Sequence, residues 1–156
     1  MNRDAVMSIA AEVEAMKPDF TTLSDSIWDF AELKFEERQS AGVLAAALEE
    51  NGFAVRRGVA GMETAFIGEF GSGEPVIAFL GEFDALAGMS QVADVAQVQP
   101  REAGATGHGC GHNLLGVGSL MGAIALARHL KANNLPGTVR YYGCPGEEGG
   151  SGKTFM

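Results

Sequence analysis

Apolar residues recur every three to four positions in the first part of the chain, a spacing that predicts helices. One apolar stripe over 6–16 follows Asn2, which could cap a helix, and Pro18 interrupts the pattern. A second stripe over 23–31 predicts another helix, and Trp28 beside it is expected to anchor the core. We therefore expect two helices that are separated at Pro18.

The next segment predicts one more helix and then changes period. A third apolar stripe predicts a helix that starts near Ser40 and stops at Asn51-Gly52, a pair typical of helix C-termini. From Phe53 the apolar positions alternate with polar ones, and a second such stretch covers 64–70. Two strands are expected there.

The run 76–80 is continuously apolar, which is the pattern of a strand covered on both faces. Glu82 and Asp84 follow it, and open α/β sheets bind ligands beyond the carboxyl ends of such strands. The segment 85–107 has little periodicity, and long irregular connections are usually functional or mobile. We expect this segment to border the site.

The rest of the chain predicts a long helix over 114–131, a turn, a strand over 138–144 and a glycine-rich loop over 145–152. A strand, a crossover helix and a second strand favour at least one parallel strand pair. Helices followed by strands with such a crossover predict an α/β fold.

Charge and composition exclude several functions. Eleven Lys and Arg against 20 Asp and Glu give a net charge of −9, so the chain lacks the basic surface that binds nucleic acid. The first 20 residues lack the apolar core of a secretory signal, and the run 114–130 is too short and glycine-rich to favour a membrane span. Neither Cys110 nor Cys144 has the setting of a disulfide partner. We expect a cytoplasmic protein that binds neither nucleic acid nor membrane.

Candidate chemistry is concentrated at 107–113, where a thiol and two imidazoles are separated by glycine. On such a loop before a helix, Cys110 and His112 can face one ion, and their donors suit zinc, manganese or a related divalent metal. The dipole of the following helix should lower the thiol pKa. Alone this spacing is weak support, because such clusters also arise by chance, and His108 is expected outside the ligand set.

Glu147 and Glu148 strengthen the metal interpretation. Adjacent residues that leave a strand point in opposite directions, so one carboxylate can bind a metal while the other acts as base toward a water. A solvated acidic loop would be the simpler interpretation of the pair alone. Asp84 either orients a metal-binding histidine or caps a turn after its strand.

The segment 146–154 also has features of a phosphate-binding loop, because it follows a strand and ends in Gly152-Lys153-Thr154. The spacing fails by one residue, since Glu147 stands where glycine is needed, and two carboxylates would repel phosphates. A nucleotide-binding protein is therefore a weakly supported alternative.

Three motifs occur in order, at 81–86, 107–113 and 145–150. Together they resemble the amidohydrolase branch of the aminoacylase and carboxypeptidase metallopeptidases, and the resemblance runs from about Ala10 to the last residue. It implies a three-layer α/β/α sandwich with a mixed sheet. Residues 1–156 would be the N-terminal part of this zinc-peptidase-like catalytic domain.

The resemblance also implies roles for individual residues. Cys110, His112 and Glu148 would bind metal, Glu147 would be the general base, and Asp84 would be the orienting acid. Two divalent metal ions, manganese or zinc, are implied, together with a small-molecule N-acyl amino acid substrate such as aminobenzoyl-glutamate. Full-length members of the family dimerise or pair with a related subunit.

The sequence departs from the family pattern at several places. Glu82 stands where other branches use a histidine ligand, Gly146 replaces an alanine, and Ala87 replaces a proline. Two later histidine ligands and an inserted dimerisation domain are not located in these 156 residues. We therefore expect a site that is incomplete and inactive alone. A non-catalytic partner subunit that keeps the fold is a further alternative.

Overall fold

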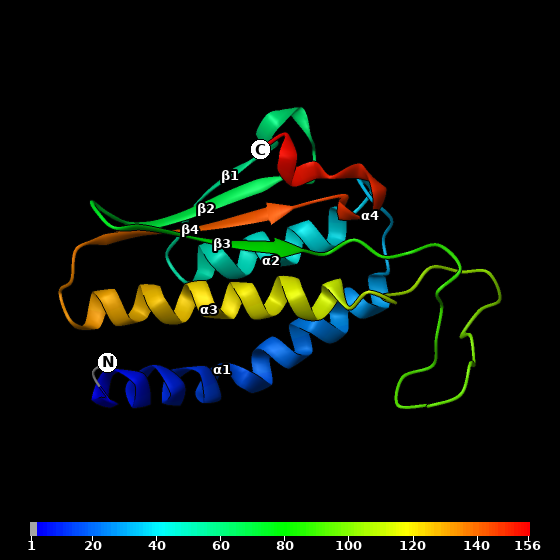
Figure 1. Ribbon diagram of the computed structural model, residues 1–156, viewed down its shortest axis with the longest axis horizontal. Helices are drawn as coiled ribbons and strands as arrows, with labels where there is room; N and C mark the ends of the chain where they lie inside the picture. The colour runs from blue at the N-terminus through cyan, green and yellow to red at the C-terminus, as the bar shows by residue number, and fades with distance from the viewer. Residues whose placement is uncertain (1–2) are drawn as a thin grey trace.

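The computed structural model describes residues 3–156 and shows a twisted sheet with its long helices on one face (Figure 1). The elements in chain order are α1 (Arg3–Phe30), α2 (Arg38–Glu50), β1 (Ala54–Arg57), η1 (Val59–Gly61), β2 (Phe66–Ser72), β3 (Val76–Glu82), α3 (His112–Ala132), β4 (Gly137–Cys144), α4 (Glu147–Gly150) and η2 (Gly152–Thr154). The predicted α/β class is confirmed.

The first helix is continuous, so the prediction of two helices separated at Pro18 is wrong. Proline lacks a backbone N–H and costs a helix one hydrogen bond, and α1 changes direction part-way along its length (Figure 1). The helix continues because tertiary packing outweighs this local cost, with Phe20 and Ile27 buried beyond the proline. The predicted Asn2 cap lies outside the described residues.

The sheet has the strand order β1-β2-β4-β3 and is mixed. β2 runs antiparallel to both β1 and β4, whereas β3 and β4 are parallel and joined by the crossover helix α3. The predicted parallel pair is therefore confirmed. Its register places Glu82 opposite Cys144, so the two strands end side by side and the segments that leave them meet.

The core lies between the inner face of the sheet and helices α2 and α3, while α1 packs over α3. Close approach of α3 to β3 requires glycine at Gly116, where a Cβ would lie 2.6 Å from the Glu82 carbonyl oxygen. The buried Tyr141 hydroxyl donates to the Gly116 carbonyl at 3.0 Å. These contacts fix the start of α3 against the end of β3.

By length and composition, α3 alone among the described helices could cross a membrane. Much of its surface is buried against the sheet and α1, which is typical of the core helix of a globular domain.

β3 is an edge strand, and the prediction that it is covered on both faces is wrong for residues 3–156. Val76, Ile77 and Leu80 are 41%, 43% and 52% exposed. The reason is topological, because no described strand pairs with the outer edge of β3 and the long helices cover only the other side of the sheet. The second helical layer of a three-layer sandwich is not found within this range.

The exposed edge should make the chain self-associate at high concentration, because unpaired backbone groups and apolar side chains offer a template for another strand. Light scattering over a concentration series should show growth beyond the monomer. Leu80→Lys should suppress this growth, whereas Leu135→Lys, at a residue 48% exposed outside the sheet, should leave it unchanged. A wild-type chain that stays monomeric throughout would contradict the prediction.

Candidate metal centre at the ends of β3 and β4

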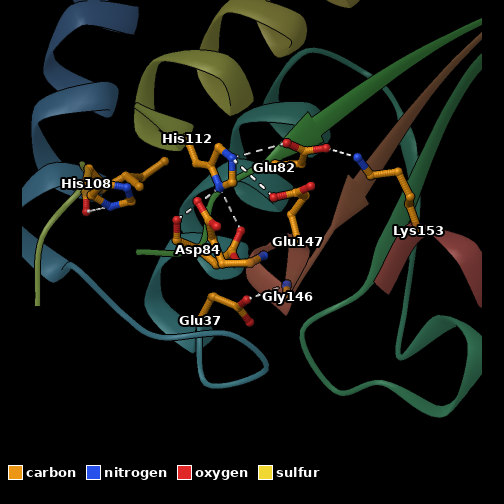
Figure 2. A network of polar contacts seen from close by, with 10 residues as sticks. Glu37, Glu82, Asp84, His108, His112, Gly146, Glu147 and Lys153 are labelled. Atoms are coloured by element: carbon orange, nitrogen blue, oxygen red, sulfur yellow. Dashed lines mark hydrogen bonds and ion pairs between the residues drawn. The ribbon is translucent and has the colours of Figure 1, made fainter. Parts of the chain in front are cut away.

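Three segments converge where the parallel strands end. Residues 82–84 close β3, residues 110–112 lead into α3, and residues 146–148 follow β4. Figure 2 shows His112 facing Glu82, Asp84 and Glu147. The long segment between β3 and α3 is closed at its base by backbone hydrogen bonds between Leu86 and Gly107, and the rest of it extends away from the sheet (Figure 1).

His112 is the centre of this cluster and is almost fully buried. Its Nδ1 lies 2.9 Å from Asp84 Oδ1, while its Nε2 lies 3.3 Å from Glu82 Oε2 and 3.8 Å from Glu147 Oε2. The hydrogen bond to Asp84 raises the pKa of His112 above its usual value. With Nδ1–H donated to Asp84, Nε2 is the ring nitrogen that faces the other carboxylates.

Asp84 ties two of the segments together. Its Oδ1 accepts the bond from His112, and its Oδ2 accepts one from the Glu148 backbone N–H at 2.8 Å. Burial alone would raise the pKa of Asp84, but these hydrogen bonds outweigh burial and lower it. An ionised, fully bonded carboxylate is what an acid that orients a histidine requires.

Two groups of donors share His112. Cys110, His112 and Glu148 have ligand atoms within 4.8 Å of one another, and so do Glu82, His112 and Glu147. Thiolate, imidazole and carboxylate donors at this separation fit zinc or manganese. The adjacent acids Glu147 and Glu148 fall into different groups, as expected for neighbours that point in opposite directions.

Cys110 is exposed and its thiol pKa is raised, mainly by a hydrogen bond to Glu148 and further by nearby carboxylates. The prediction that the helix dipole lowers this pKa is therefore wrong. The negative charge around the thiol outweighs the dipole of α3, so metal binding would have to displace the thiol proton.

Lys153 is a site residue whose sequence context pointed only to the disfavoured phosphate loop. Its ammonium forms an ion pair with Glu82 Oε1, and this contact raises the pKa of Lys153 (Figure 2). The Gly146 and Glu148 amides of the same loop donate to carboxylates of the chain. A phosphate loop needs such amides and its lysine free for phosphates, so the geometry disfavours that alternative.

Glu37 is a second residue that the sequence pattern did not mark. Its side chain is fully buried and accepts hydrogen bonds from the Gly146 N–H at 2.7 Å and the Thr64 hydroxyl at 2.9 Å. Burial raises the pKa of Glu37. Glu36 precedes it in sequence and is exposed, so no local signal distinguished the two acids.

His108 lies outside both donor groups, as expected. Its Nε2 lies 3.0 Å from the Ile27 carbonyl oxygen, and burial lowers its pKa. The expected core anchor Trp28 is only half-buried, and its ring is stacked near that of His108 at a centroid distance of 6.3 Å. This pair fastens the loop before Cys110 to the end of α1.

Comparison with known proteins gives consistent relatives, although no family model matches the chain. It is 56% identical over 144 residues to one of the subunits of p-aminobenzoyl-glutamate hydrolase from Escherichia coli (strain K12), which covers 92% of this chain and 30% of that protein. It is 32% identical over 143 residues to Xaa-Arg dipeptidase of Mus musculus, which covers 84% of this chain and 29% of that protein. The chain thus spans less than a third of these relatives.

A solved structure agrees with these matches. A dinuclear metal-binding peptidase of the M20 family from Bacillus subtilis superposes with a TM-score of 0.60 at 28% identity, over 83% of this chain and 36% of that chain. High identity along most of the chain, a shared fold and the three motifs agree. The chain belongs to the M20 metallopeptidases, the aminoacylase and carboxypeptidase type that its sequence resembles.

Proposed function

We propose that the chain is the N-terminal part of the catalytic domain of a metal-dependent amidohydrolase that cleaves an N-acyl amino acid. The observation that carries this proposal is the grouping of Cys110, His112 and Glu148 around one point, with Glu147 beside them. Aminobenzoyl-glutamate is the first candidate substrate, because the relative at 56% identity bears that substrate in its name. A dipeptide is the second, on the same ground.

The proposed cofactors are two divalent ions, manganese or zinc, held in part by Cys110, His112 and Glu148. The donor chemistry fits them, and the M20 relative is described as dinuclear. When bound, such ions would act as Lewis acids on the substrate carbonyl and the attacking water. Later residues of a longer protein would complete the ligand set.

Glu147 is the proposed general base. Its side chain is 38% exposed, so it can reach a water and a substrate, and it lies on the Nε2 side of His112. The carboxylate would take a proton from the attacking water and pass it to the leaving amine. Asp84 would keep the His112 tautomer that leaves Nε2 free to bind metal.

A non-catalytic partner subunit is the second candidate, since the relative at 56% identity is itself a subunit. Retention of every donor in the two groups favours an enzyme over that alternative. We also propose a cytoplasmic location, because Cys110 and Cys144 are both free thiols, and pairing with a related subunit.

The purified chain should bind divalent metal weakly and should not hydrolyse aminobenzoyl-glutamate, because its donor groups lack the later ligands. Equilibrium dialysis against manganese and an assay for released glutamate would measure both. Metal-dependent release of glutamate by the 156-residue chain would contradict the prediction.

A graft tests the catalytic roles directly. The chain would replace the matching 144 residues of the Escherichia coli relative, and the hybrid should hydrolyse aminobenzoyl-glutamate. In the hybrid, Glu147→Gln should lower kcat by about 10²- to 10⁴-fold with metal content unchanged, because the base is lost. Glu36→Gln, at an exposed acid, is the control. Full activity with Glu147→Gln would exclude the proposed base.

Lys153→Met should raise the affinity for manganese by about three- to tenfold, because the positive charge that neutralises Glu82 is removed beside the donors. Equilibrium dialysis would measure the change. Lys17→Met removes an equal charge from an exposed pair on α1 and should have no effect. Equal affinities of wild type and Lys153→Met would show that Lys153 does not influence the centre.

A further inference from the structure

We propose that Glu37 is a positioning residue for the paired acids: its buried carboxylate holds the backbone turn from which Glu147 and Glu148 project. The inference deepens the proposed function and rests on the roles given there to these two acids. Glu37 touches neither a donor atom nor the substrate region, so it would act only through the loop (Figure 2).

The first observation is the placement of the Glu37 side chain. It is fully buried, which is costly for a carboxylate unless its oxygens are bonded. Both oxygens are used, one by the Gly146 N–H and the other by the Thr64 hydroxyl. Glu37 also stands at the start of α2, where its carbonyl accepts the Ala41 N–H. The carboxylate is therefore held on a rigid element.

The second observation is the fit between the loop and Phe35, two residues before Glu37. A Cβ at Gly146 or at Gly150 would lie 2.6 Å from an atom of the Phe35 ring. Gly146 itself has φ +61°, a left-handed conformation that glycine adopts without strain. The segment 35–37 thus offers the loop both a ring to lie on and a carboxylate to bind.

The third observation is how the loop is held on either side of Glu147. The Gly146 N–H donates to Glu37, and the Glu148 N–H donates to Asp84. Asp84 belongs to the candidate centre, whereas Glu37 reaches the loop from α2, 109 residues earlier in sequence. Without Glu37, the turn at glycine would be free to rotate, and Glu148 would lose its fixed position relative to Cys110 and His112.

Cobalt(II) is the probe for the test, because a thiolate-to-cobalt absorption band reports binding at Cys110. In titrations of the 156-residue chain, Glu37→Ala should weaken cobalt binding about 10- to 100-fold, as is usual when support of a ligand is removed. Glu37→Gln keeps an oxygen for the Gly146 N–H and should restore most of the affinity.

A matched control separates positioning from stability. Leu48→Ala removes a fully buried side chain of the same helix and should destabilise the fold without changing the cobalt affinity. If Glu37→Ala does not fold, Phe35→Ala, at a side chain 40% exposed, loosens the same loop and should give the same loss. Wild-type affinity in the folded variant, or an equal loss in Leu48→Ala, would overturn the inference.

The same titration separates this inference from the proposed function. A wild-type band that disappears in Cys110→Ser but is unchanged in Glu37→Ala would overturn the positioning role and leave the metal centre standing. Absence of any Cys110-dependent band in the wild type would overturn the metal centre, and the role of Glu37 with it.

Discussion

The carboxylate of Asp84 is the interaction on which the candidate centre depends. One oxygen binds the His112 ring and the other binds the Glu148 amide, so a single buried group joins the end of β3 to α3 and to the loop after β4. Hydrogen bonds to an ion are strong in a low-dielectric interior. The parallel pairing of β3 and β4 and the glycine contact of α3 serve to bring these three chain ends within reach of one side chain.

Charge sets the second constraint. Glu82, Asp84, Glu147 and Glu148 surround His112, and Lys153 is the cation that contacts them within residues 3–156. Without metal, protons relieve the repulsion, which is why the pKa of His112 and the thiol pKa of Cys110 are both raised. Metal binding would release these protons, so the cluster is organised for a cation that its own residues only partly replace.

The sequence predicted those parts of the fold that depend on local patterns. The unit from β3 through α3 to β4 and the helix α2 follow from periodicity and turn residues, and the donors stand where motifs placed them. The errors come from long-range effects. Packing carries α1 through Pro18, strand order exposes β3, and carboxylates from other segments reverse the expected shift at Cys110. Glu37 and Lys153 act across 109 and 71 residues, where no local pattern can mark them.

The likeness of the loop after β4 to a phosphate loop has a physical basis. In both cases a strand ends at a glycine turn whose backbone N–H groups face a binding site for negative charge. Here the protein supplies that charge itself, through Glu37 and Asp84, and the side chains of the loop carry carboxylates toward the opposite side. The amides therefore bind internal anions and hold Glu147 and Glu148 ready for a cation, which converts an anion-binding turn into a support for a metal site.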